Sequence, residues 1–250
     1  MIIRMSEIQP KRGTRALFTF GRFQPPTTGH QILIESVAAA AAAMEADAYI
    51  FVTSSSNNLE AKAVKAMMKN GEFKSIKENE NPLSVDAKVF YLKKMYPATP
   101  VTFINTTEYD CKQLFQVLER LRSAGYESIT MMAGGDRVPT FSKMFEKAEA
   151  GVDVISAGER NLANLASNAP KTMSGTKMRL AAVRGDFDFF KRGVMIGAMT
   201  EDDARDLMGL VRVGLGFPAA LEGGKRKTRV RPATRRRYRL RENERLYRRD

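Results

Sequence analysis

The chain has 250 residues, 43% of them hydrophobic, which is enough for one α/β domain with a full core and an appendage. Its single cysteine, Cys111, excludes an internal disulfide, and the N-terminus and the longest apolar run, 37–44, are too weakly apolar for a signal peptide or a membrane span. Of the net charge of +13, residues 225–250 contribute +10, from 13 Lys or Arg and 3 Asp or Glu, so residues 1–224 carry +3. We therefore expect a soluble cytoplasmic protein without a membrane partner, in which a nearly balanced body precedes a polycationic tail.

Short apolar runs alternate with amphipathic stretches from residue 15 to residue 156. The expected strands are 16–20, 48–53, 101–104, 128–133 and 152–156, and the expected helices between them are 29–45, 85–95, 112–123 and 141–148. Ser84 and Asp110 suit helix N-caps, and Gly125 suits a helix end. This alternation predicts βαβ units and therefore a doubly wound, Rossmann-like α/β fold with a parallel sheet of about five strands.

Two parts of the chain depart from this alternation. Residues 54–81 are polar and rich in Lys and Glu, and we interpret them as an excursion from the sheet with a helix over 60–69. The C-terminal part is helical, with expected helices 175–184, 187–191 and 201–211 before a glycine-rich linker at 214–224. We predict a domain over 1–216, followed by a linker and an Arg-rich basic tail over 217–250.

The first candidate site is Gly21-Arg22-Phe23-Gln24-Pro25-Pro26-Thr27-Thr28-Gly29-His30, directly after the first expected strand. There the amides and the dipole of a helix N-terminus favour a phosphate, Pro25 and Pro26 stiffen the loop, and Gly29 allows a close backbone approach. His30, the only histidine in the sequence, lies on the first turn of the helix. The alternative is that His30 is a capping or core histidine and that the glycines only turn the chain.

The second candidate site is Lys171-Thr172-Met173-Ser174-Gly175-Thr176-Lys177-Met178-Arg179, which again places hydroxyl residues and glycine at a helix start. Such a helix start can bind a second phosphate group, and Lys177 and Arg179 can neutralise charge that develops during phosphoryl transfer. Neither segment fits the Walker-type pattern, which disfavours a P-loop ATPase.

The third candidate site is Gly135-Asp136, which follows the fourth expected strand, where ligands sit in open α/β sheets. Asp136 is a candidate contact for a ribose or for magnesium, and equally a cap for the next helix. Arg160 is as compatible with a surface position as with binding an acceptor phosphate. Met131 and Met132, within the expected strand, are interpreted as core residues.

Together the two phosphate motifs resemble the nucleotidylyltransferase superfamily, which carries Thr/His-x-Gly-His and a later Ser-Gly-Thr-x-x-Arg. The matching residues are Gly21, Phe23, Pro25, Thr27, Gly29, His30, Ser174, Gly175, Thr176 and Arg179. The opening Gly-Arg-Phe-Gln-Pro is most similar to archaeal-type nicotinamide mononucleotide adenylyltransferases, and the phrases at 135–137 and 156–160 resemble members from phages and large DNA viruses. The resemblance covers about residues 15–195. Thr27 stands where those adenylyltransferases usually have histidine, and the chain has no tryptophan.

This resemblance implies transfer of AMP from ATP, or of another nucleotide from its triphosphate, to a phosphate-bearing acceptor, with Mg²⁺ sharing the charge and pyrophosphate leaving. The best guess for the acceptor is nicotinamide mononucleotide. It implies that His30 and Thr27 donate to the α and β phosphates. Arg179, Ser174 and Thr176 then hold the β and γ phosphates with help from Lys177, and Arg22 is a candidate for the acceptor phosphate. The expected nucleotide-binding residues are Gly21, Arg22, Phe23, Gly29, Gly135, Asp136, Ser174, Gly175 and Thr176, and no metal ligand of the protein is assigned.

The basic tail supports a different class of function. Residues 225–227, 235–237 and 248–249 are clusters of Lys and Arg, with Tyr238 and Tyr247 among them, which suits contact with RNA, DNA or an acidic protein surface. A solvated polycation without a partner is the alternative. The competing hypothesis is a nucleic-acid-binding or virion-associated structural protein on a nucleotidyltransferase scaffold, found in the host cytoplasm or the virion if viral. Class I aminoacyl-tRNA synthetases share related motifs, but the chain is short for them, and a homo-oligomer is also compatible with the sequence.

Overall fold

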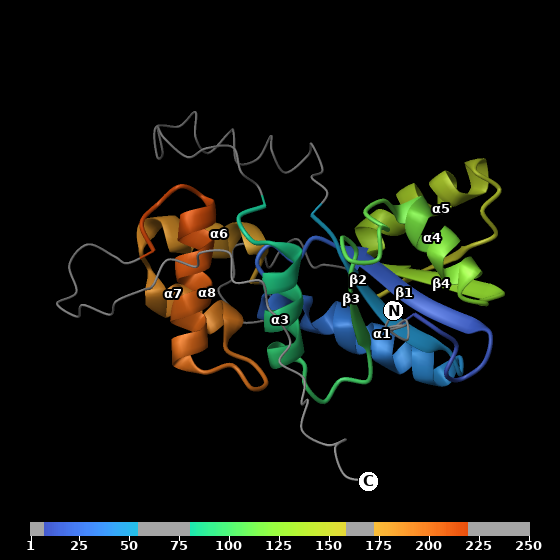
Figure 1. Cartoon of the computed structure of the whole chain (residues 1–250), viewed down its shortest axis with the longest axis horizontal. Coiled ribbons are helices and arrows are strands. Elements are labelled where there is room, and N and C mark those ends of the chain that lie inside the picture. Colours follow the sequence, from blue (N-terminus) through green and yellow to red (C-terminus); the bar gives the residue numbers. More distant parts are fainter. Residues whose placement is uncertain (1–7, 55–80, 159–172, 220–250) are drawn as a thin grey trace, which may run out of the picture. The chain divides into compact units, whose positions relative to one another are not determined.

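A computed structural model describes residues 8–54, 81–158 and 173–219, and within them a five-stranded sheet forms the centre of the fold (Figure 1). Its strands are β1 (Arg15–Gly21), β2 (Asp47–Val52), β3 (Thr102–Asn105), β4 (Ser128–Ala133) and β5 (Asp153–Ser156). They lie in the order β3-β2-β1-β4-β5, and each neighbouring pair is parallel. The predicted parallel sheet of about five strands is confirmed.

Helices connect the strands and follow the sheet. They are the 3₁₀ turn η1 (Thr28–His30), α1 (Gln31–Ala43), α3 (Val85–Met95), α4 (Leu114–Ser123), the 3₁₀ turn η2 (Gly135–Arg137), α5 (Val138–Lys147), α6 (Gly175–Arg184), α7 (Phe187–Val194) and α8 (Glu201–Gly214). The helix predicted over 60–69 and Arg160 lie outside the described residues, as does the basic tail. Among the helices of the described ranges, none has the length and apolarity to cross a membrane.

The sheet is covered by helices on both faces, which makes the fold doubly wound. Leu17 and Ile50 pack in one apolar cluster with residues of α1, α3, α6, α7 and α8. Phe18 and Phe51 face the other way and pack with residues of α4 and α5. Because successive strand residues point to opposite faces, strands buried on both sides read as the continuous apolar runs seen in the sequence. The Rossmann-like fold class predicted from the sequence is therefore confirmed.

Most helix ends lie within two residues of the prediction, but α5 starts three residues early, and α7 and α8 end three residues late. Ser84 is the N-cap of α3, where its hydroxyl oxygen accepts from the amide of Ala87 at 3.2 Å, as predicted. The prediction that Asp110 caps the next helix is wrong, because α4 starts after Gln113 and Asp110 has φ +49° in the preceding turn. Helix α5 begins earlier than predicted, since a proline in its first turn lacks only an amide hydrogen that the helix start leaves unpaired.

A buried arginine joins the last helix to the end of α6. The guanidinium of Arg212, on α8, is 6% exposed and donates to the backbone carbonyls of Ala182 and Val183. These carbonyls lie in the last turn of α6, where a cation favourably meets the negative end of the helix dipole. This contact holds α6, and with it the second phosphate motif, against the C-terminal helices.

Candidate nucleotide-binding site

The loop between β1 and η1 is largely buried and is held by two side chains, one of its own and one from the end of α3. The amide nitrogen of Gln24 donates to the carbonyl of Leu83 at 3.1 Å, and its amide oxygen accepts from the backbone N–H of Leu83 at 3.2 Å. The hydroxyl of Tyr96, at the end of α3, donates to the carbonyl of Thr27 at 3.2 Å, and burial raises the pKa of this phenol above its ordinary value. The loop is therefore fixed in place by the two ends of α3 as well as by its own prolines.

His30 caps the turn that carries it. Its Nδ1 accepts from the backbone N–H of Thr27 at 3.0 Å, and its ring lies 4.9 Å from the ring of Phe23, centre to centre. The hydroxyl of Thr27 also lies 3.0 Å from Nδ1, but this hydroxyl donates its hydrogen to the carbonyl of Met173. Because Nδ1 accepts, the hydrogen of the neutral imidazole sits on Nε2. The capping interpretation is thus confirmed, and capping fixes the tautomer in which Nε2 can donate to an anion.

The two phosphate motifs are in direct contact. The Thr27 hydroxyl donates to the carbonyl of Met173 at 2.8 Å, across 146 residues of sequence. A Cβ on Gly29 would lie 2.0 Å from the same carbonyl oxygen, and a Cβ on Gly175 would lie 2.5 Å from the carbonyl oxygen of Gln24. Glycine is therefore required at both positions, because any side chain would push the two segments apart.

Arg179 strengthens this junction. It is 7% exposed, and its guanidinium donates to the carbonyl of Gln24 and, at 3.2 Å, to the hydroxyl of Thr176. Ser174 is the N-cap of α6, where its hydroxyl oxygen accepts from the amide of Lys177 at 3.2 Å. The result is that the starts of η1 and α6, with the positive ends of their helix dipoles, lie together.

The contacts of Thr27, Arg179 and Thr176 bear on the roles predicted for them. The Thr27 hydroxyl is fully buried and directs its hydrogen to protein, so its contacts give it a joining role in place of donation to a phosphate. Arg179 and Thr176 bond each other at the same junction. Gly175, Lys177 and Ser174 are half-buried at the start of α6, where amides and a cation can meet an anion.

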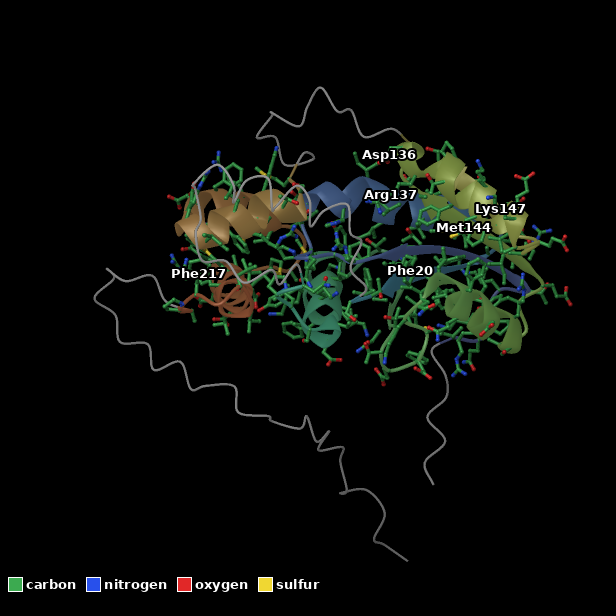
Figure 2. The ribbon with its side chains drawn as sticks, turned by 90° about the horizontal axis from the view of Figure 1, so that it is seen from above. Phe20, Asp136, Arg137, Met144, Lys147 and Phe217 are labelled. Atoms are coloured by element: carbon green, nitrogen blue, oxygen red, sulfur yellow. The ribbon has the colours of Figure 1, made fainter. Side chains whose placement is uncertain are left out.

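Gly135 and Asp136 lie at the same edge of the sheet but make a separate turn. They follow β4, the neighbour of β1, and Asp136 and Arg137 are exposed at the beginning of α5 (Figure 2). A Cβ on Gly134 would lie 2.8 Å from a carboxylate oxygen of Asp136. The alternative that Asp136 caps α5 is wrong, because the N-cap residue is Arg137 and it makes no side-chain capping bond. Among the described residues, no backbone hydrogen bond joins this turn to the two phosphate motifs.

The sequence analysis missed Lys88, a fully buried lysine on α3. Its ammonium donates to the carbonyl of Thr53 at 2.6 Å, and the amide of Thr53 donates to the carbonyl of Gly21 at 3.0 Å, next to Arg22. Burial, together with the charge of Arg22, lowers the pKa of Lys88 to about 7. The helical stripe of buried residues that includes Lys88 was the available signal, since a lysine in an apolar stripe is rarely buried without a reason.

A resident metal centre finds little support in these residues. The described ranges contain no group of three or more His, Cys, Asp or Glu side chains that could hold an ion. Mg²⁺ commonly binds through substrate phosphates and one or two carboxylates, while keeping several waters. Asp136 is a carboxylate at the carboxyl edge of the sheet. A magnesium ion would therefore enter bound to a triphosphate and would not need a site made only of protein ligands.

A cavity of about 280 Å³ lies elsewhere in the domain. It is lined by residues at the start of β2 and β3, including Asp47 and Thr102, and by Lys11 and Arg12. These strand starts are at the amino edge of the parallel sheet, whereas both phosphate motifs are at the carboxyl edge. Ligands of open α/β sheets bind at the carboxyl edge, so we place the candidate site at the motifs and not in this cavity.

Comparison with known proteins adds little to this geometry. No protein-family model and no curated protein matches the chain. Among solved structures, a Vibrio parahaemolyticus protein named "Putative Nicotinate-nucleotide Adenylyltransferase" is similar, with a TM-score of 0.41 and 16% sequence identity over 69% of this chain and 89% of that chain. A likeness of this degree carries no argument about substrate or activity, so the candidate site stands on its own residues.

Proposed function

We propose that this protein is a nucleotidyltransferase that transfers AMP from ATP to a phosphate-bearing acceptor, with nicotinamide mononucleotide as the best candidate acceptor. The observation that supports this most strongly is the contact between the two phosphate motifs. Two helix starts, a histidine with its hydrogen on Nε2 and the cation Lys177 belong to one junction, which suits a polyphosphate better than a single phosphate.

In the proposed reaction an oxygen of the acceptor phosphate attacks the α-phosphorus of the triphosphate. The new P–O bond forms as the bond from the α-phosphorus to the bridging oxygen breaks, and pyrophosphate leaves with that electron pair. No side chain is covalently modified, so the protein contributes positioning and charge stabilisation. Mg²⁺ carried by the triphosphate supplies further charge neutralisation.

The residues divide this work by position. His30 donates from Nε2 to the α or β phosphate, and the amides at the start of α6 with Lys177 hold the β and γ phosphates. Arg179 keeps the two motifs together and contributes its charge to the same place. Arg22, half-buried at the end of β1, holds the acceptor phosphate. Thr27 joins the motifs through Met173.

The direct test is pyrophosphate release by the full-length protein with each nucleoside triphosphate against a panel of acceptors. We expect release with ATP plus nicotinamide mononucleotide, and none with either substrate alone. Arg137→Lys serves as a matched control, because Arg137 is an exposed arginine outside the two motifs. Folded protein that releases no pyrophosphate with any pair would refute the proposal.

A second candidate function is nucleic-acid binding through the tail, which the +10 charge of residues 225–250 favours. Removal of these residues is expected to leave transfer to small acceptors nearly unchanged. It is also expected to abolish most nucleic-acid binding, and binding by the full chain should fall steeply with salt because each phosphate contact releases counterions. Transfer rates and binding isotherms at two salt concentrations on both proteins check this. A truncated protein that stays folded but loses transfer would instead place the tail in the active site.

A further inference from the structure

Lys88 combines full burial with a neighbouring cation. Its side chain is 0% exposed, and within the described part of the chain Nζ donates to the Thr53 carbonyl and pairs with no carboxylate. A lysine can usually reach water with its charged end, but this one does not. Burying an ammonium group without a counter-ion costs free energy. The group can avoid this cost by losing its proton or by pairing with a bound anion.

The charges around Lys88 favour the first outcome in the absence of a ligand. Arg22, from the loop after β1, is the charge that acts on it, and together with burial it lowers the pKa of Lys88 to about 7. On the same helix, Asp86 is bonded to the side-chain amide of Asn105 at 2.6 Å. From the ends of β2 and β3, Thr53 offers a carbonyl and Asn105 an uncharged amide. Burial and the charge of Arg22 therefore favour the uncharged form of Lys88 more than solvent would.

The position of Lys88 connects it to the candidate site. Thr53, whose carbonyl accepts from Lys88, donates its own amide hydrogen to the carbonyl of Gly21. Lys88 is therefore linked through one residue to the position that precedes Arg22. Arg22 is half-buried, so an anion can reach it from solvent. The long stem of a lysine lets Nζ turn from the Thr53 carbonyl toward such an anion.

We propose that the phosphate group of the acceptor binds beside Arg22 together with one proton, which Lys88 takes up. This rests on the proposed function, because it assigns the anion to the acceptor of the transfer. The proton comes from solvent and bonds to the lone pair of Nζ, and no bond of the ligand changes. A doubly negative phosphate monoester offsets the repulsion from Arg22, so the charged form of Lys88 becomes the stable one.

The sign of the pH dependence follows. Well below pH 7 Lys88 is already charged, so the anion binds without taking up a proton. As pH rises above 7 the free protein loses that proton and binding must restore it, so affinity falls. An arginine in its place stays charged throughout and removes this dependence.

Sulfate is the probe of choice, because it stays doubly negative across this range and any pH dependence then belongs to the protein. Titration calorimetry of the full-length protein in two buffers of different ionisation enthalpy counts the protons taken up. We expect about half a proton per sulfate at about pH 7, nearly one at about pH 8.5, and affinity about fiftyfold lower at about pH 9 than at about pH 7. Lys88→Arg should keep binding and lose the uptake, and Lys88→Gln should bind at least about a hundredfold more weakly than the charged protein, also without uptake.

Circular dichroism is the control that both variants are folded. The proton uptake of the unsubstituted protein tests the proposal even if a variant does not fold. The proposal is overturned if sulfate fails to bind, if it binds without proton uptake, or if Lys88→Gln shows the same uptake, which would assign the proton to another group such as His30. The pyrophosphate assay separates the two claims. Transfer without Lys88-linked uptake would refute this inference alone, and uptake without transfer would refute the proposed function alone.

Discussion

The segments after β1 and β4 have a similar architecture and different surroundings. The two strands are neighbours, and each leads through a glycine-containing segment and a 3₁₀ turn into a helix. After β1, Thr27 and Gly29 are pressed against Met173 at the start of α6. After β4, Asp136 and Arg137 are exposed. A glycine-containing connection from strand to helix therefore forms a candidate binding site only where a second segment packs against it.

The largest expected effect is on His30. His30→Ala should lower the rate of transfer by about a hundredfold or more, since it removes one preorganised donor to the transferring phosphate. Melting temperature should show that the fold survives, because His30 is only half-buried. An unchanged rate in active protein would mean that its Nε2 does not meet the phosphate and that the two turns differ less than we argue.

Arg179 and Arg137 offer the second comparison, between a buried and an exposed arginine. Arg179→Lys keeps the charge but loses the planar fork that reaches Gln24 and Thr176, so triphosphate affinity should fall about tenfold. Arg137→Lys should change it less than about twofold. Equilibrium titration with ATP measures both, and the opposite ranking would show that the phosphates bind at the turn after β4.

Gly29 and Gly134 test how tightly each turn is packed. Gly29→Ala forces a methyl group to within 2.0 Å of a backbone oxygen and should lower the melting temperature by roughly 5 °C, the scale of 1–3 kcal/mol for overpacking. Gly134→Ala meets only the end of the Asp136 side chain, which can turn away, so a change within about 2 °C is expected. Equal losses in thermal denaturation would contradict the contrast between the turns.

The smallest effect is expected at Asp136. Asp136→Asn removes one exposed carboxylate, so transfer should slow less than about threefold. Rates measured over a range of magnesium concentrations provide the check. A large loss that excess magnesium restores would make Asp136 a ligand of the triphosphate-bound ion and join the two turns into one site.

The sequence by itself predicted much of the fold and the outline of the site. All five strands and the described helices were expected within a few residues, because apolar periodicity, capping residues such as Ser84, and glycine at helix ends act over short stretches of chain. Asp110 shows the limit, since a residue suited to a cap forms one only if the turn around it permits, and its φ of +49° does not. The placement of two phosphate motifs at helix starts was likewise local and therefore visible.

Tertiary structure alone decided how those pieces are used. The hydroxyl of Thr27 bonds a carbonyl 146 residues away, which only the packing of α6 against the first loop could determine. Lys88 lies in a helix whose sequence gives no partner for it, and the folding of α3 onto β2 buries it near Arg22. Whether a polar group meets solvent, a backbone oxygen or another charge depends on residues distant in sequence, and this is why the chemistry of the site required the folded chain.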